Sequence, residues 1–261
     1  MHALVLAGGQ GRRLQPFTTV FPKPLAPVGD MPIIEIVLRQ LAAHGFREAT
    51  ISIGYLGHLV QAYFATLGPI PGLAIGYLPE KEPLGTVGPA AYLPADHDGL
   101  LTINGDVLCD VDFAAFADAF RRERPALAVA VHPRPQQIDF GVVDVDSRGD
   151  IQSWVEKPHT EHLCSMGINI LSPEAVAAIV PGERLDVPDL VRRLVERNQR
   201  VMAWRCNGYW LDIGRRDDYE RAQAEFDTVR DRILPPAGSA KRFVDPSIGE
   251  GSRFSGSPPR R

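Results

Sequence analysis

The chain has 261 residues and a formal net charge of -4 at pH 7, so we expect one large α/β domain and no surface for nucleic acid polymers. No apolar run approaches the roughly 20 residues that span a bilayer, and no secretory leader precedes the first strand pattern, which favours a cytoplasmic protein without a membrane partner. The 3 cysteines are widely spaced and match no zinc or redox pattern.

The first half of the chain alternates strand patterns with helical patterns. Strands are predicted over 2–8, 49–55, 73–79 and 99–107, and amphipathic helices over 33–45, 58–68 and 111–123. Alternation of this kind indicates βαβ units. The predicted fold is therefore a Rossmann-like α/β fold, with a mostly parallel central sheet flanked by helices.

From Ala126 onward the pattern changes to short strands without intervening helices. These strands are predicted over 126–133, 140–146, 150–158 and 164–172. Such runs favour hairpins and antiparallel pairs, so this region is interpreted as a lid or substrate-binding half. Helices over 173–180 and 187–199, a strand over 201–214 and a last helix over 216–229 complete the predicted domain, 1–234. The tail, 235–261, is rich in Pro, Gly, Ser and Arg, which is typical of a linker or of disorder.

Glycines, prolines and cations crowd the segment after the first strand, "LAGGQGRRLQPFTTVFPKPL". Gly8, Gly9 and Gly11 lack a Cβ, so backbone N–H groups can approach an anion closely. The spacing is neither GxxxxGK[ST] nor GxGxxG. Arg13 and Lys23 add cations that a triphosphate needs. An ordinary glycine-rich turn with solvated arginines is the alternative interpretation.

This segment resembles the signature LAGGxGTRLxPxTxxxPKPL of the sugar-1-phosphate nucleotidyltransferases, with Arg12 where Thr or Ser is usual. "EPLGT", "NGDV", "VEKP" and "YWLDIG" follow in the family's order, so the resemblance reaches about residue 230. The resemblance implies that a nucleoside triphosphate and a sugar 1-phosphate react, with Mg²⁺, to give a nucleotide sugar and pyrophosphate. The expected nucleotide-binding residues are Leu6, Ala7, Gly8, Gly9, Gly11, Arg12, Glu80, Gly85 and Thr86.

Asp106 follows a predicted parallel strand, where open α/β sheets bind ligands, and a carboxylate there suits Mg²⁺. The family resemblance implies Asp212 as the second metal ligand. Arg13, Lys23 and Asp106 are the expected catalytic residues, acting by position and charge while the sugar phosphate attacks directly. A helix cap is the alternative role for Asp106.

On the sugar side, the resemblance assigns Glu156 to a sugar hydroxyl and Lys157 to the sugar phosphate. Gly141 and Asn169 fall on segments that line the sugar pocket in the family. A surface ion pair, a β-bulge and a polar strand end are the respective alternatives. The identity of the sugar stays open.

The segment "PEKEPLGT" indicates which base the triphosphate carries. Guanine presents adjacent donors that suit a carboxylate, and Glu80 and Glu82 are available where a uracil- or thymine-binding site would favour glutamine. The segment is similar to that of mannose- and heptose-1-phosphate guanylyltransferases. We therefore expect GTP, with UTP or dTTP and glucose 1-phosphate as the alternative.

Two other classes of protein remain possible at this stage. Asp110 and Asp112 form a D-x-D of the kind found in metal-dependent glycosyltransferases. A non-catalytic nucleotide-sugar-binding regulatory subunit would share the fold. The tail segment 244–254 is similar to one coil of a left-handed β-helix, too short to bury a core alone, and a homodimer is possible.

Overall fold

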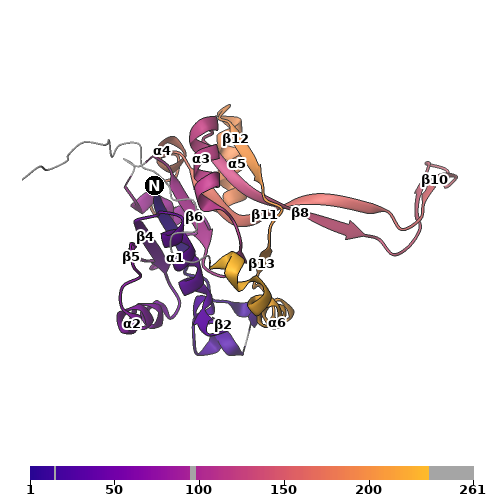
Figure 1. Cartoon of the computed structure of the whole chain (residues 1–261). Helices are drawn as coiled ribbons and strands as arrows, with labels where there is room; N and C mark the ends of the chain where they lie inside the picture. Colours follow the sequence, from indigo (N-terminus) through magenta and orange to yellow (C-terminus); the bar gives the residue numbers. More distant parts are fainter. Residues whose placement is uncertain (15, 95–97, 235–261) are drawn as a thin grey trace, which may run out of the picture.

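The computed structural model describes residues 1–14, 16–94 and 98–234, without the side chains of Arg12 and Phe17. Its centre is a seven-stranded sheet with the order β12-β8-β11-β6-β1-β4-β5 (Figure 1). The strands are β1 (His2–Ala7), β4 (Glu48–Ile53), β5 (Ala74–Pro79), β6 (Leu100–Asn104), β8 (Leu127–Gln137), β11 (His159–Leu171) and β12 (Val201–Arg205).

Only β11 reverses the strand direction in this sheet. It pairs antiparallel with β6 and β8, whereas β1 with β4, β1 with β6, β4 with β5 and β8 with β12 are parallel pairs. The mostly parallel sheet is thus confirmed. Not all of the later strands are antiparallel. β12, which follows the helical segment 173–196, pairs parallel with β8.

Three small two-stranded sheets complete the strands. They pair β2 (Pro27–Val28) with β3 (Met31–Pro32), β7 (Val107–Cys109) with β13 (Trp210–Asp212), and β9 (Val142–Val145) with β10 (Ile151–Val155). The single strand expected over 201–214 is divided into β12 and β13. Between them a Cβ at Gly208 would clash with the Asp110 carboxylate, so the chain passes close to Asp110 there.

Helices cover both faces of the central sheet. The helices are α1 (Ile33–Ala43), α2 (Gly57–Leu67), α3 (Phe113–Glu123), α4 (Pro173–Ala177), α5 (Val187–Glu196) and α6 (Arg216–Ile233), with 3₁₀ turns η1 (Arg12–Leu14), η2 (Phe17–Thr19), η3 (Lys23–Leu25) and η4 (Gly88–Tyr92). One buried cluster joins α1, α2 and α3 to the sheet face that carries Val5. A second joins η4, α4 and α5 to the opposite face, through Leu4.

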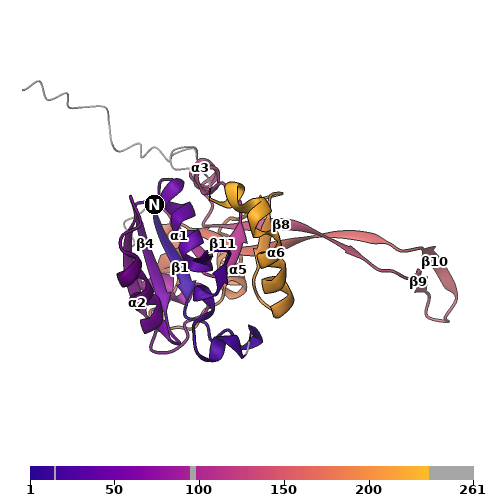
Figure 2. The ribbon, with the colours of Figure 1, turned by 60° about the horizontal axis from the view of Figure 1, so that its bottom comes forward.

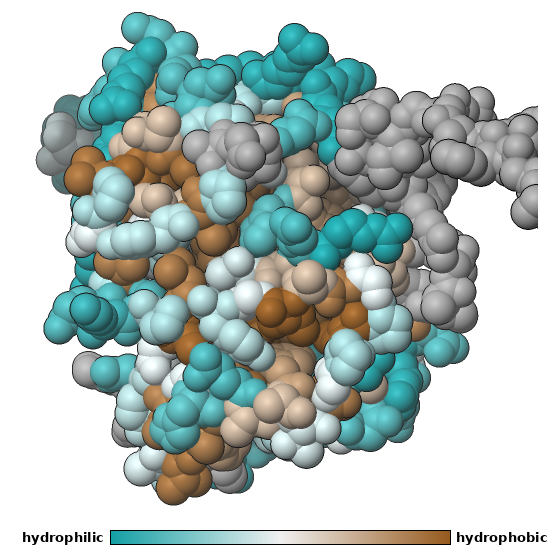
Figure 3. Space-filling view, turned by 90° about the vertical axis from the view of Figure 1, so that its left-hand side faces the viewer, coloured by the Kyte–Doolittle hydropathy of each residue, from teal (hydrophilic) through white to brown (hydrophobic). Residues whose placement is uncertain are grey.

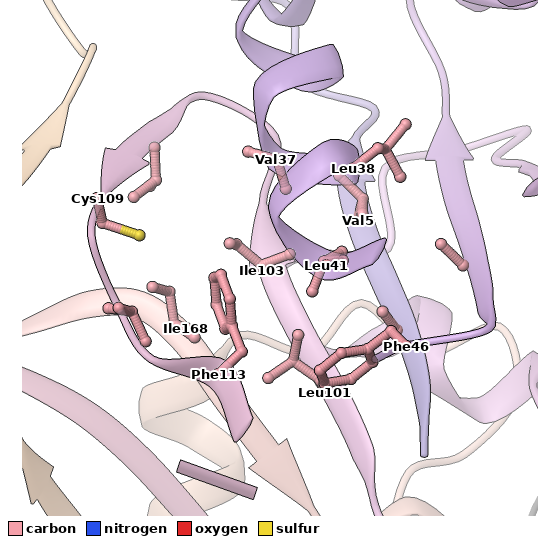
Figure 4. Packing of buried hydrophobic residues seen from close by; sticks show 14 of the residues in the cluster. Val5, Val37, Leu38, Leu41, Phe46, Leu101, Ile103, Cys109, Phe113 and Ile168 are labelled. Carbon is pink, nitrogen blue, oxygen red and sulfur yellow. The ribbon is translucent and has the colours of Figure 1, made fainter. Parts of the chain in front are cut away.

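Side chains alternate along a strand, so neighbouring residues of β1 enter different cores. Figure 4 shows the first core, in which Val37, Leu38 and Leu41 of α1 lie over Val5, Leu101 and Ile103. A third cluster packs α6 against β2, β7 and β13. At one sheet edge, the face around β5 and α2 mixes apolar patches with polar residues (Figure 3).

The two longest strands continue beyond the body as an arm, defined here as residues 132–164. β8 and β11 remain paired from His132 with Cys164 to Gln137 with His159, and the β9–β10 hairpin forms the end of the arm (Figures 1 and 2). β11 contacts β6 only over residues 168–171, and its register with β8 shifts between Ser165 and Asn169. The arm therefore begins just before this register shift, where β11 no longer pairs with β6 and pairs with β8 alone.

Across the described ranges, no helix is both long enough and apolar enough to cross a bilayer. The expected linker and the expected β-helix coil, within 235–261, lie outside the described residues. The domain boundary at Leu234 stays a prediction.

Candidate active site

A pocket of about 400 Å³ lies at the carboxyl ends of β1, β5 and β6. These ends meet at one sheet edge because the three strands run in the same direction. Its lining consists of Leu6, Ala7, Gly8, Gly9, Gln10, Gly11, Arg13, Lys23, Pro24, Glu80, Pro83, Gly85, Thr86, Asn104, Asp106 and Gly214. The structure thus gathers the expected nucleotide-binding and catalytic residues, except that the Arg12 side chain lies outside its described part.

The glycine-rich loop needs its glycines for two different reasons. Gly11 has φ +59°, and a Cβ there would lie 2.9 Å from Thr18 Cγ2, while the Thr18 hydroxyl donates to the Gly11 carbonyl at 2.8 Å. A Cβ at Gly9 would meet no atom within 4 Å. Gly11 therefore allows the turn itself, whereas Gly9 leaves the backbone open to a ligand.

Arg13, Lys23 and Asp106 line the pocket, and Asp212, which is not among its lining residues, lies near enough to feel their charges. The Lys23 ammonium pairs with Asp106 Oδ2, and a Cβ at Gly214 would lie 3.3 Å from an Arg13 guanidinium nitrogen. Burial raises the pKa of Asp212, the charge of Asp106 raises that pKa further, and Lys23 and Arg13 oppose the rise. Nearby positive charge therefore favours the ionised form of Asp212.

Backbone pairing brings Asp106 and Asp212 to the same place. Asp106 occupies the turn between β6 and β7, Val107 pairs with Asp212, and Ile213 N–H donates to the Asp106 carbonyl at 3.1 Å. Asp106 is not a helix cap, since β7 follows it. No group of three or more His, Cys, Asp or Glu side chains forms a metal cluster within the described ranges. A pair of carboxylates beside a phosphate-sized pocket is nevertheless the donor set that Mg²⁺ accepts.

Glu80 fixes the loop after β5 through hydrogen bonds to β4 and within the loop. Glu80 Oε1 accepts from the Ser52 hydroxyl at 2.6 Å, and Glu80 Oε2 accepts from Leu84 N–H at 2.8 Å. Glu82 is exposed and is absent from the lining of the pocket as described. Of the two glutamates, only Glu80 therefore lines the pocket.

Thr86 and Gly85 hold the same loop against the segment before α5. The backbone N–H and hydroxyl of Thr86 donate to Asp186 Oδ1 at 2.9 and 3.1 Å, and Val187 N–H donates to the Thr86 hydroxyl at 2.9 Å. Gly85 has φ +79°, and a Cβ there would lie 2.4 Å from the Leu185 carbonyl oxygen. Both residues line the pocket, yet their contacts also shape it.

Several residues that line the pocket were not predicted as site residues from the sequence. They are Gln10, Pro24, Pro83, Asn104 and Gly214. All of them lie inside or beside the motifs that were recognised, so position within those motifs was the available signal. Asp186, which anchors Thr86, carried no such signal because its partner is 100 residues away along the chain.

The expected sugar-phosphate residues are placed elsewhere. Gly141, Glu156 and Lys157 belong to the arm, and within the described residues none of them lines the pocket. Glu156 Oε2 accepts from Trp154 Nε1 at 3.2 Å. Asn169 is 2% exposed and donates to the Thr102 hydroxyl at 3.2 Å inside the sheet.

The D-x-D carboxylates are engaged in structural contacts. Asp110 Oδ2 accepts from the Arg232 guanidinium of α6. Asp112 Oδ1 caps α3 by accepting from Ala115 N–H at 2.9 Å. These contacts favour a role in folding over the glycosyltransferase interpretation.

The profile of the nucleotidyl transferase family matches residues 2–228. A UTP–glucose-1-phosphate uridylyltransferase from Synechocystis is 31% identical over 85% of this chain and 62% of its own length. A mannose-1-phosphate guanylyltransferase catalytic subunit beta from Drosophila pseudoobscura is 29% identical, over 97% of this chain and 72% of its own. A mannose-1-phosphate guanyltransferase from Schizosaccharomyces pombe is 30% identical, over 95% and 72%. The chain thus spans less than two thirds of the cyanobacterial relative.

Solved structures show the same fold. HddC from Yersinia pseudotuberculosis, also crystallised with GMP-PN, matches with a TM-score of 0.66 and 23% identity over 86% of this chain and 99% of that chain. A Bacillus anthracis protein described as a glucose-1-phosphate thymidylyltransferase, in complex with sucrose, matches with a TM-score of 0.68 and 24% identity over 86% and 94%.

Proposed function

This chain belongs to the nucleotidyl transferase family, and we propose that it joins a sugar 1-phosphate to the nucleotidyl part of a nucleoside triphosphate, releasing pyrophosphate. The observation that carries this proposal is the single pocket in which a glycine-rich loop, Arg13 and Lys23 face Asp106. A nucleotide-sugar-binding regulatory subunit would not need this set of charges. Relatives named as glucose-1-phosphate uridylyltransferase and mannose-1-phosphate guanylyltransferases support the same reaction.

The reaction needs no protein nucleophile. A phosphate oxygen of the sugar 1-phosphate attacks the α-phosphorus of the triphosphate, a new P–O bond forms, and the bond to the leaving pyrophosphate breaks. Backbone N–H groups around Gly9 and the Arg13 guanidinium hold the phosphates in line. Catalysis then consists of orientation and of charge stabilisation in the transition state.

Asp106 and Asp212 are the residues that would hold Mg²⁺. The bound cation would offset negative charge on the α-phosphate during attack. The raised pKa of Asp212, caused by burial and then by Asp106, supports a cation at this position, because a divalent ion favours the ionised form of Asp212. Lys23, already paired with Asp106, orients that carboxylate.

GTP is the proposed triphosphate. Of Glu80 and Glu82, only Glu80 is among the residues that line the pocket, and a carboxylate matches the adjacent donors of guanine. The guanylyltransferase relatives agree with this choice. UTP or dTTP with glucose 1-phosphate is the second candidate, because the Synechocystis relative carries a uridylyltransferase name.

The sugar phosphate is proposed to meet Lys157, and a sugar hydroxyl to meet Glu156, with Gly141 and Asn169 on neighbouring segments. These roles rest on the resemblance of "VEKP" and of the flanking strands to the family. The proposed setting for the reaction is the cytoplasm.

Pyrophosphate release tests the function. GTP, UTP, dTTP, CTP and ATP are each crossed with mannose, glucose and heptose 1-phosphates in the presence of Mg²⁺. We expect release with GTP and one of the sugar phosphates, and none without the sugar phosphate. Silence for every pair, combined with binding of a nucleotide sugar, would support the regulatory subunit instead.

A further inference from the structure

The arm carries its charged pair far from the pocket of its own chain. Six residues of β8, 132–137, lie between the start of the arm and the level of Lys157, where Ile138 N–H donates to the Pro158 carbonyl at 3.2 Å. At about 3.3 Å per strand residue, Glu156 and Lys157 lie roughly 20 Å beyond the body. The pocket of the same chain is therefore without them (Figure 2).

The contacts at the start of the arm set its direction. His132 Nε2 lies 2.9 Å from the Gly208 carbonyl oxygen, the Arg134 guanidinium lies 4.6 Å from the centre of the Trp210 ring, and Arg205 pairs with Glu161 at 2.7 Å. Folding the arm back onto its own pocket would break these contacts. Specific contacts therefore hold the start of the arm against the body.

The end of the arm exposes more apolar surface than an isolated hairpin supports. The exposed apolar side chains there are Ile138, Phe140, Val142, Val143, Val145, Ile151, Trp154 and Val155. A two-stranded ribbon is marginal in water unless another surface covers one of its faces. Because side chains alternate along a strand and Trp154 pairs with Val143 and Ile151 with Val145, these four apolar residues share one face of the hairpin. An exposed apolar face on a protruding hairpin indicates an interaction surface.

We propose that the arm docks on a second copy of this chain and places Glu156 and Lys157 beside the pocket of that copy. This inference rests on the proposed function, because the roles of both residues do. A second copy is the occupant that fits: each chain has a pocket without the pair and an arm that presents the pair. A two-fold arrangement completes both sites and covers both arms with one self-complementary contact.

The edge that holds the pocket also offers apolar contacts. Val20 and Tyr55, 73% and 38% exposed, lie on the loops that follow β1 and β4, whose carboxyl ends form that edge. Exposed apolar groups there suit the apolar end of an incoming arm.

Complementation between two defective chains tests whether the arm of one chain completes the pocket of the other. Asp106→Asn removes the pocket carboxylate and Lys157→Gln removes the arm cation, and a heterodimer of the two is purified through two different tags. In the proposed arrangement one of its two sites combines an intact pocket with an intact arm. At a sugar 1-phosphate concentration well below KM, where the Lys157→Gln homodimer is slow, the heterodimer should therefore recover roughly half of the wild-type rate. Activity no greater than the mean of the two variant homodimers would overturn the proposal.

A second measurement does not depend on turnover. Light scattering should give a dimer for the wild type and a monomer for Ile151→Asp, which places a charge on the docking face. Val180→Asp is the matched control, because Val180 at 61% is as exposed as Ile151 at 62% but lies after α4. It should remain dimeric.

A monomeric wild type, or a dimer that survives Ile151→Asp, would overturn the proposal. Loss of the dimer in Ile151→Asp alone supports docking even when no sugar phosphate reacts, so failure of the inference and failure of the proposed function give different results.

Discussion

The pocket and the arm are built in opposite ways. The pocket lies at the carboxyl ends of three buried parallel strands, and its polar side chains are tied to each other and to backbone groups. The arm is a two-stranded ribbon throughout, first β8 with β11 and then β9 with β10, and its apolar side chains near the tip face water. The side chains proposed to bind phosphates are thus held by the central sheet, whereas those proposed to bind the sugar lie on the protruding arm. The pocket is packed within one chain, whereas the arm presents apolar side chains that its own chain leaves exposed.

Removing the pocket carboxylate should have the largest effect. Asp106→Asn is expected to lower turnover by about 10²–10³-fold, because the variant would lose a ligand of the cation that offsets negative charge in the transition state. Pyrophosphate release measures this loss. Asp112→Asn is the control, since asparagine also caps a helix well, and it should keep both the turnover and the thermal midpoint of the wild type. Equal losses of turnover in the two variants would instead support the glycosyltransferase interpretation of the D-x-D motif.

On the arm, the expected effect is confined to one substrate. Lys157→Gln should raise the KM for the sugar 1-phosphate about tenfold, the loss of one charge-assisted contact, and leave the KM for the triphosphate unchanged. Initial rates over both substrates separate these constants. Arg148→Gln, also on the arm, is the control and should change neither. A rise in the triphosphate KM alone would place Lys157 in a different role.

The turn at Gly11 should matter to folding as well as to binding. Gly11→Ala places a Cβ at positive φ against Thr18, so we expect the free energy of unfolding to fall by about 1–2 kcal/mol. Gly9→Ala meets no atom within 4 Å and should leave that free energy nearly unchanged. Urea unfolding of both variants makes the comparison. Equal stability of the two would show that the loop relaxes around the extra methyl group.

Base recognition should produce a smaller, selective change. Glu80→Gln is expected to lower kcat/KM for GTP several-fold relative to UTP, because an amide cannot accept from two adjacent donors as a carboxylate does. Glu82→Gln, at an exposed position, should change neither value. If Glu80 only fastens the loop through Ser52 and Leu84, kcat/KM will fall equally for both triphosphates.

The smallest effect concerns pH and stability in the body. Burial lowers the pKa of His44, and the nearby Asp112 only partly opposes this shift. Below the unfolded value of about 6.5, the unfolded chain binds a proton that the folded chain resists, so the free energy of unfolding should fall as pH drops towards the folded pKa. Denaturant unfolding at about pH 7.5 and about pH 5.5 measures the slope. It should be shallower in His44→Gln, and an unchanged slope would contradict the assignment.

The nucleotide side of the site was predictable because its signals are local. Gly8 to Lys23 form one continuous segment, and the position of Asp106 follows from strand direction alone. The position of the sugar-side residues was not predictable in the same way. Glu156 and Lys157 stand in a recognisable step, but where that step lies depends on the register shift at Ser165 to Asn169, which no short motif encodes. Asn169 donates to the Thr102 hydroxyl inside the sheet, and its role toward the sugar stays a prediction.

Mass spectrometry of the products from GTP, a sugar 1-phosphate and Mg²⁺ is the most direct test of the proposed reaction. We expect one nucleotide sugar for each pyrophosphate with the wild type, and neither product with Asp106→Asn. Inorganic phosphate or pyrophosphate without a nucleotide sugar would contradict direct transfer, because water rather than the sugar phosphate would then be the attacking group.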